Sequence, residues 1–236
     1  RDTRFERTEI RSRHKLSYEE AQAVLDKKRS IDPETDDALH ALAALAEALR
    51  EKRKRRGSLD FDLPDSRVLL GEKGEPVSIR QIERLESHRL VEAFMLLANE
   101  TVAQHLARRE IPSIYRVHED PDPAKVEAFL ELATEFGYSL KQNKDGRYSS
   151  RAFQKLMVKM GGKPEQKFLS YLMLRSFKQA QYTEVNQGHF GLASACYTHF
   201  TSPIRRYPDL IVHRLLKMAI DRKTSGRGAE GLYGRL

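Results

Sequence analysis

The feature that most limits how this chain can fold is a long stretch of helical periodicity at residues 83–108. Its apolar and small side chains recur mostly at three- to four-residue spacing, which places them on or near one face of an α-helix. The residues concerned are Leu90, Phe94, Leu97, Thr101 and Leu106. The stretch therefore predicts one long amphipathic helix.

Capping signals predict shorter helices before and after it. Ser17 and Glu20 have the spacing of a capping box, in which each side chain binds the backbone N–H of the other residue. A second helix is expected from Asp36, as its cap, to Gly57, which follows the basic run 52–56. Further helices are predicted at residues 123–136, 148–160, 166–180 and 202–220.

The strand signals are fewer. A β-hairpin is predicted from the period-two alternation at 59–63 and from strands 68–70 and 77–79, which flank a glycine-containing turn. Short strands or extended segments are expected at 5–10, 114–117 and 190–193. The chain is therefore assigned to the α+β class, helix-rich with a few antiparallel strands.

Composition places the chain among soluble globular proteins, since 39% of its 236 residues are hydrophobic and 32% are charged. No apolar run approaches the roughly 20 residues that cross a bilayer, so no membrane association is expected. Cys196 is the only cysteine, which excludes a disulfide framework and a thiolate zinc site and favours a reducing cytoplasm. The net charge of +8 is compatible with a polyanionic partner.

The segment 189–216 carries the most information about function, and its residues 197–210 read YTHFTSPIRRYPDL. Ser202 before Pro203 predicts a helix N-terminus, whose free N–H groups and partial positive charge attract anions. Arg205 and Arg206 would lie in that first turn, where the helix dipole disfavours cations unless a phosphate binds there. A capped helix whose arginines pair with carboxylates elsewhere is the alternative explanation.

This segment resembles the signature of the RNB catalytic domain of the ribonuclease II and ribonuclease R family. Other segments agree with that family in the same order, and the resemblance covers about residues 8–220. They are residues 11–20, 59–75, 88–99 and 115–119. The resemblance implies that residues 1–220 are the C-terminal portion of an RNB-type catalytic domain. Residues 221–236 are expected to form a loop or tail leading toward an RNA-binding barrel.

In this family, single-stranded RNA is hydrolysed processively from its 3′ end to nucleoside 5′-monophosphates, with two divalent metal ions activating water. The resemblance therefore implies a Mg²⁺-dependent 3′–5′ exoribonuclease acting on single-stranded RNA, and we expect a monomer. A catalytically inactive RNB-like module that binds RNA is the alternative. A helix-turn-helix DNA-binding protein is disfavoured, because the sequence has no recognition-helix pattern and runs of charge are usually solvated.

The resemblance assigns roles to individual residues. Arg205 matches the arginine that stabilises charge at the scissile phosphate, Glu92 a glutamate near the terminal nucleotide, and Tyr18 a tyrosine beside the active site. Phe61 matches the aromatic residue that stacks on the last bases. Four further residues of the motif are expected to contact RNA: Ser202, Arg206, Tyr207 and His199.

Three of these assignments have structural alternatives. Tyr18 could simply cover a helix end, and Phe61 on a half-buried strand could belong to the core. Glu92 lies between apolar neighbours on a helix, so its carboxylate needs a partner. That partner could be part of a functional site or of a buried ion pair.

The family's metal ligands come mainly from an aspartate-rich segment before the Tyr18 region, and residues 1–17 do not resemble it. Residues 31–38 imitate that segment but follow Tyr18, and they are better explained as a helix start. The acidic group at 118–122 is likewise explained by a helix cap at Asp122. No metal ligand is therefore predicted in this chain, and we expect little or no turnover from it alone.

Overall fold

The computed structural model describes residues 3–61, 65–71 and 73–221, with the backbone alone at 65–67 and 80–82. These residues confirm the predicted α+β class, because they form mainly helices with two small antiparallel sheets. In chain order the elements are α1 Tyr18–Leu25, α2 Pro33–Arg56, β1 Asp65–Leu70, β2 Pro76–Ile82, α3 Glu86–Arg108, β3 Tyr115–Val117, α4 Pro123–Glu135, α5 Ser150–Met160, α6 Gln166–Ser176, β4 Gln181–Thr183 and α7 Tyr207–Ile220.

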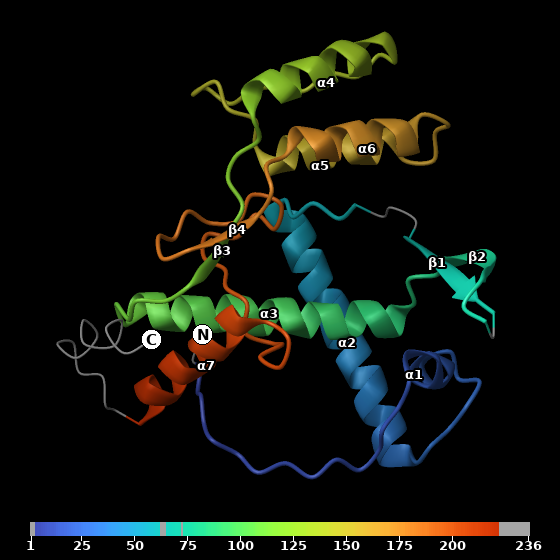
Figure 1. Ribbon diagram of the computed structural model, residues 1–236, viewed down its shortest axis with the longest axis vertical. Coiled ribbons are helices and arrows are strands. Elements are labelled where there is room, and N and C mark those ends of the chain that lie inside the picture. Colours follow the sequence, from blue (N-terminus) through green and yellow to red (C-terminus); the bar gives the residue numbers. More distant parts are fainter. Residues whose placement is uncertain (1–2, 62–64, 72, 222–236) are drawn as a thin grey trace.

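Helix α3 runs through the middle of the molecule, as its periodicity predicted (Figure 1). Helix α2 crosses it, α1 packs against both, and α7 contacts α3 as well. Helices α4, α5 and α6 form a separate layer, in which α6 packs against the other two. The fold is therefore organised around one long helix that touches elements from both ends of the chain.

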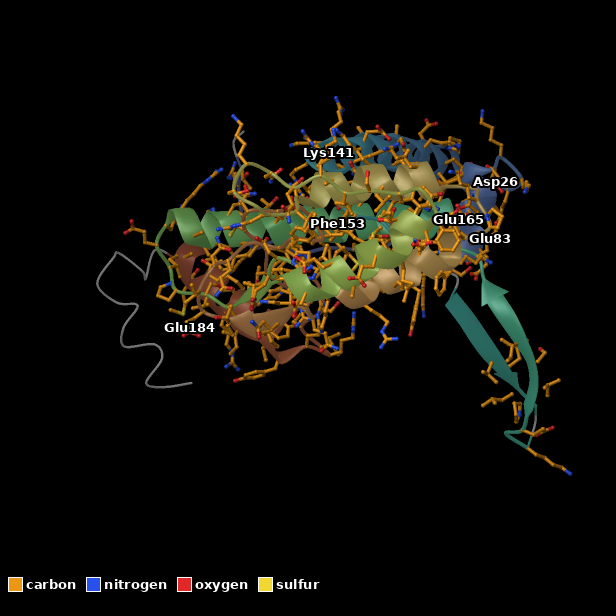
Figure 2. The ribbon with its side chains drawn as sticks, turned by 90° about the horizontal axis from the view of Figure 1, so that it is seen from above. Asp26, Glu83, Lys141, Phe153, Glu165 and Glu184 are labelled. Atoms are coloured by element: carbon orange, nitrogen blue, oxygen red, sulfur yellow. The ribbon has the colours of Figure 1, made fainter. Side chains whose placement is uncertain are left out.

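Two clusters of buried apolar side chains hold these helices together. The first fills the α4–α6 layer around the fully buried Phe153, whose ring meets Phe177 edge-on at 5.0 Å and Phe190 at 5.9 Å (Figure 2). The second joins α3 to α7 through side chains that include Leu106 and Val212. Burial of these faces supplies most of the favourable free energy of folding.

Strands β1 and β2 form the predicted hairpin, which projects away from the helices (Figure 2). Val68 lies opposite Ile79 in its register, and both side chains are exposed. The alternating run 59–63 was predicted to be part of this hairpin, but residues 59–61 form no strand. Residues 62–63 lie outside the described residues. Leu59 is instead buried in the α4–α6 cluster, and its N–H donates to the carbonyl of Gly191 at 2.7 Å.

Helix α2 begins earlier than predicted, because Asp32 rather than Asp36 is its N-cap. The Asp32 carboxylate accepts hydrogen bonds from the Thr35 N–H at 2.9 Å and from the Thr35 hydroxyl at 2.8 Å. Pro33 occupies the first helical position, where its missing N–H costs nothing. Asp36 accepts the N–H of Ile31 at 3.1 Å instead. The predicted helix itself and its end at Gly57, which has φ +103°, are confirmed.

Replacing this cap gives a direct test of the corrected boundary. We expect Asp32→Ala to lower the free energy of unfolding by about 1 kcal/mol, because the first turn of α2 loses its capping acceptor. Asp37→Ala, an exposed change just beyond the first turn of α2, is the matched control and is expected to leave stability nearly unchanged. Urea unfolding followed by circular dichroism measures both variants. Equal losses in the two would contradict Asp32 as the cap.

The helix predicted from Ser202 begins only at Tyr207, which corrects the expected position of the two arginines. Residues 203–205 form a turn, in which the N–H groups of Arg205 and Arg206 donate to the Ser202 carbonyl at 3.3 and 3.1 Å. Pro208 also suits a first helical turn, so the sequence offers two possible starts. Arg206 is the N-cap residue, and Arg205 precedes the helix rather than lying on it.

Burial of an aromatic ring explains why α6 is shorter than predicted. The helix ends at Ser176 rather than near Ala180, because Phe177 adopts an extended backbone with ψ 147° and places its ring in the α4–α6 cluster. The chain then forms strand β4, which the sequence patterns did not indicate. Strand β4 pairs with β3, where Tyr182 lies opposite Arg116.

Two expected extended segments are not strands. Residues 5–10 have no regular structure, although Phe5 packs against the α3–α7 cluster. Residues 190–193 form a tight turn, closed by a hydrogen bond from the Ala193 N–H to the Phe190 carbonyl at 2.9 Å. The helix expected after Asp122 is confirmed, with that carboxylate as the cap of α4. Beyond residue 221, the predicted tail lies outside the described residues.

Candidate nucleic-acid interface

A buried carboxylate organises the loop that carries most of the predicted contacts, His199 to Arg206, here called the 199–206 loop. Asp209, on the first turn of α7, is 0% exposed. Its Oδ2 accepts the Ser202 N–H at 2.7 Å and the Arg206 guanidinium at 2.8 Å. Arg206 is therefore occupied by an ion pair, as the structural alternative expected, and Ser202 is held through its backbone.

Arg205 has no partner in the same arrangement, as far as the described residues go. Its side chain is exposed and makes no hydrogen bond or ion pair with any described residue. Tyr207 beside it is also exposed, at 62%. A guanidinium presents five N–H donors in a planar fork, which matches the oxygen atoms of a phosphate. The loop therefore offers a free cation on a backbone that Asp209 holds in place, and the first residue of α7 adds an aromatic ring beside it.

Side chains of helices α3 and α7 hold the loop through hydrogen bonds and ring stacking. Asn99 of α3 is buried, donates to the Tyr197 hydroxyl at 2.9 Å and accepts the Phe200 N–H at 2.9 Å. His213 of α7 stacks on the Phe200 ring at 4.0 Å and hydrogen-bonds the Phe200 carbonyl at 2.9 Å. These contacts join two helices to one short segment, so the loop is positioned by tertiary packing.

His199 belongs to a second group of side chains, two of which the sequence did not single out. Its Nδ1 lies 2.7 Å from the hydroxyl of Tyr182 on β4, and the Arg116 guanidinium lies 4.7 Å above the Tyr182 ring. Burial, together with the nearby charge of Arg206, lowers the pKa of His199 to about 4. The imidazole is therefore neutral near pH 7. Arg116 and Tyr182 come together only because β3 and β4 pair.

His189 and His118 form a neighbouring pair of neutral imidazoles. Their rings lie 5.0 Å apart, and the Nδ1 of His118 accepts the Gly191 N–H at 3.1 Å. A Cβ added to Gly191 would lie 3.0 Å from that Nδ1, a tight contact that the imidazole could accommodate only by moving a few tenths of an ångström. Burial, and then the charge of His118, lowers the pKa of His189 to about 3.

Because the pKa values of these imidazoles are lowered in the folded protein, we predict that the free energy of unfolding falls in mild acid. The folded-state pKa of His189 is about 3 against an ordinary value of 6.5, so the unfolded chain binds more protons below that pH. The stability that neutral His189 and His199 contribute is present above about pH 6.5 and is lost progressively as the pH falls. We expect the thermal unfolding midpoint to drop between about pH 7 and about pH 5. His189→Gln is expected to flatten that dependence, and an unchanged slope would contradict the assignment.

Glu92 lies in an ion-pair network at the other end of α3. Arg84 donates to the Glu92 carboxylate and also to Asp60, the latter at 2.9 Å. Burial works against the charge on Arg84, but the hydrogen bonds to Glu92 and Asp60 raise its pKa overall. The partner that Glu92 was expected to need is therefore Arg84. Both side chains of this ion pair are partly exposed to solvent.

Tyr18 and Phe61 occupy different environments. Tyr18 is 44% exposed and stacks on His88 of α3 at 4.0 Å, with the rings 22° apart. Its helix begins with the predicted capping box of Ser17 and Glu20. Phe61 packs against the α4–α6 cluster, with its ring 5.7 Å from that of Phe177. Phe61 is only partly buried, so core packing and base stacking are both open to it.

One face of α3 connects these residues. His88, which holds Tyr18, lies four residues before Glu92, and Asn99, which holds the 199–206 loop, lies seven residues after it. Spacings of four and seven residues repeat on one helical face. Glu92 and Asn99 are therefore about 10 Å apart along the axis. The structure thus places Tyr18 on the helical turn before Glu92 and the support of the Arg205 loop about two turns farther along the same helix.

The described side chains do not form a site for the metal ions that the family resemblance implies. Within the part of the chain that the structure describes, no three His, Cys, Asp or Glu side chains are grouped to hold a metal ion. Glu92 and Asp60 are both bound to Arg84. In the acidic group at 118–122, Glu119 pairs with Lys178 and Asp122 caps α4. These residues do not fit a Mg²⁺ site, and we assign them no metal-dependent step.

Comparison with known proteins agrees with this arrangement. The sequence matches the RNB domain over residues 1–222. Ribonuclease R of Aquifex aeolicus is 45% identical over 214 residues, which are 89% of this chain and 30% of that protein. Mycoplasma genitalium RNase R in complex with ribose methylated single-stranded RNA has a TM-score of 0.86 at 29% identity, over 94% of this chain and 35% of that one. The same RNase R with double-stranded RNA has a TM-score of 0.85, over 94% of this chain and 40% of that one.

This chain therefore spans about a third of the length of the proteins it resembles. Among the described residues, no helix is both long enough and apolar enough to cross a bilayer. The match to the domain covers almost the whole sequence, and the helical arrangement around α3 is shared with a solved RNase R. The chain belongs to the RNB domain family.

Proposed function

We propose that this chain is part of an exoribonuclease that hydrolyses single-stranded RNA processively from its 3′ end and releases nucleoside 5′-monophosphates. The observation that carries the proposal is the open guanidinium of Arg205 on a loop held by buried Asp209, within a chain of the RNB domain family. Ribonuclease R relatives and an RNase R structure with single-stranded RNA support it. The proposal extends the family relationship to a reaction and a substrate.

Arg205 is proposed to bind the phosphate that is cleaved. As the phosphodiester bond breaks, negative charge grows on its oxygen atoms, and a positioned guanidinium stabilises that charge. Because Asp209 already holds the loop, little reorganisation is needed when the phosphate arrives. Arg206 is proposed to add positive potential while it keeps the loop in place. Ser202 acts through the backbone turn that it anchors.

The remaining residues are proposed to hold the RNA strand. Phe61 and Tyr207 offer rings for base stacking, which accepts any base because every base has a π-face. Glu92 and Tyr18 are proposed to contact the terminal nucleotide, since Tyr18 stacks on His88, which lies one turn before Glu92 on α3. His199, neutral and bonded to Tyr182, is proposed to line the path of the strand beside Arg116.

The setting of the reaction is proposed from the same resemblance. Mg²⁺ is the proposed cofactor, and the described residues are given binding roles rather than metal ligation. Single-stranded RNA is the proposed partner, the cytoplasm is the proposed location, and the protein is proposed to be a monomer. The inactive RNA-binding module is not favoured, since relatives at 45% and 40% identity are both ribonuclease R proteins.

The proposal is tested with full-length protein, Mg²⁺ and single-stranded RNA carrying either a 5′ or a 3′ label. We expect the 5′-labelled RNA to be shortened progressively to a small end product. The label of the 3′-labelled RNA should appear at once in a released mononucleotide. A chelator should abolish both. RNA that is retained on the protein but never shortened would replace the exonuclease with an RNA-binding module. Internal fragments from both labels would indicate an endonuclease instead.

A further inference from the structure

A cavity of about 360 Å³ lies between the C-terminal half of α2, the middle of α3 and the α5–α6 pair. Its wall includes Glu92 and Asp60 of the Arg84 ion-pair network, and we call it the Arg53 pocket. Small-molecule pockets span about 300–1,000 Å³, so this one holds a single small ligand rather than an extended strand. Apolar side chains contribute to its wall, namely those of Leu59, Leu96, Met157, Val158 and Leu192.

Three cations of α2 line the pocket, and two of them already have partners. Arg50 pairs with Glu86 at 2.6 Å and with Glu47 at 3.1 Å. Lys54 lies 3.7 Å from Glu51. The ion pairs of these two side chains satisfy at least part of their charge.

Arg53, between them in sequence, differs from both. Its guanidinium makes no hydrogen bond and no ion pair with any described residue, although the side chain is half-buried. Burial lowers the pKa of Arg53, with Glu92, Glu100 and Asp60 acting in the other direction from a distance. A half-buried guanidinium without a direct partner is costly unless a ligand supplies one.

None of the three carboxylates that line the pocket fills that role, and Glu51 is the partner of Lys54. Asp60 and Glu92 are both bound to Arg84, which is not among the residues that line the cavity. Their negative charge is therefore shared with a different guanidinium. What Arg53 lacks is a set of acceptor oxygens within hydrogen-bonding distance, and a phosphate provides such a set in the geometry of the guanidinium fork.

We propose that the Arg53 pocket binds one nucleoside 5′-monophosphate, with its phosphate on Arg53 and its base against the apolar side chains of the wall. This inference rests on the proposed function, because such a nucleotide is the product of that reaction. Glu92 lines the same cavity, so the pocket adjoins the position proposed for the terminal nucleotide. A nucleotide released there has a short path into the pocket, which makes Arg53 a determinant of product binding and release.

Direct titration of adenosine 5′-monophosphate onto full-length protein, without Mg²⁺ or RNA, tests the pocket by calorimetry. We expect Arg53→Gln to weaken binding on the order of tenfold or more, because the charge-assisted bonds to phosphate are lost. Lys52→Gln, at an exposed neighbouring position outside the pocket, is the matched control and should bind as the wild type does. Adenosine, which lacks the phosphate, should bind weakly and equally to all three proteins.

Several outcomes would overturn the proposal. They are equal affinity in the Arg53→Gln and wild-type proteins, absence of nucleotide binding, and dependence on Arg53 seen only with an RNA oligonucleotide. Arg53→Lys keeps the charge without the fork and should give intermediate affinity, which guards against a glutamine variant that fails to fold. Failure of RNA shortening with intact, Arg53-dependent nucleotide binding would refute the exonuclease and leave the pocket standing. The reverse result would refute only the pocket.

Discussion

Replacing Arg205 with alanine is expected to slow RNA shortening by roughly 10²–10³-fold, the usual loss when one donor that stabilises transition-state charge is removed. The side chain is exposed and makes no hydrogen bond or ion pair with the described residues, so its removal should not disturb the fold. The loss should therefore appear in the rate of the chemical step. Single-turnover digestion of 5′-labelled RNA with Mg²⁺ measures that rate, and circular dichroism checks that the unfolding midpoint is unchanged.

Arg214 provides the control for the charge itself. It is an exposed arginine on α7, and Arg214→Ala removes the same charge away from the 199–206 loop. We expect that variant to keep nearly full activity, with only the modest salt-sensitive loss in RNA binding that any cation contributes. Similar rates in the two variants would mean that Arg205 acts through general electrostatics. Wild-type turnover by Arg205→Ala would remove it from the site altogether.

Replacing Asp209 with alanine is expected to lower the free energy of unfolding by about 3–5 kcal/mol. The carboxylate is fully buried and accepts hydrogen bonds from the Ser202 N–H and from Arg206, so its loss leaves a largely buried guanidinium without its partner. The 199–206 loop should lose its position as well. Urea unfolding measures the first effect, and RNA binding by the surviving folded protein measures the second.

Asp209→Asn separates the two contributions of that carboxylate. The amide oxygen can still accept from Ser202 and Arg206, but the negative charge is gone, so we expect a smaller loss of stability and a loop that stays in place. Asp221→Ala is the comparison for an ordinary surface ion pair, since Asp221 pairs with Arg7 at an exposed position. It should cost at most about 1 kcal/mol. An equally small loss for Asp209→Ala would contradict its role as the anchor of the loop.

Much of the fold could be predicted from local signals. The central helix, the capping box at Ser17, the glycine end of α2 and the β1–β2 hairpin follow from periodicity, capping and turn residues, which act within a few positions of one another. The predictions failed where distant contacts decide. Phe177 ends α6 because its ring enters a core made by other helices, and β4 forms only because β3 is there to pair with it.

The residues of the candidate site likewise fall into those that the sequence predicted and those that only the structure revealed. Sequence motifs identified Arg205, Glu92, Tyr18 and Phe61 by their resemblance to a family, and their roles in RNA hydrolysis stay predictions. The sequence did not indicate Arg116 and Tyr182, because nothing in their local patterns connects them to His199. The start of α7 could not be chosen from sequence either. Both Pro203 and Pro208 suit a first turn, and the choice depends on a buried carboxylate seven residues from Ser202.

The sequence by itself therefore determined the family, the fold class and the residues that bear charge and rings, because motifs and periodicities are properties of the local chain. The tertiary structure alone decided which of those charges are free. Arg206 and Arg205 are adjacent and chemically identical, yet one is consumed by Asp209 and the other is open to a ligand. That difference arises because an ion pair depends on the separation of its atoms in space, and the turn of the chain before α7 brings Arg206, three residues before Asp209, within 2.8 Å of that buried carboxylate, whereas Arg205 makes no such pair with the described residues.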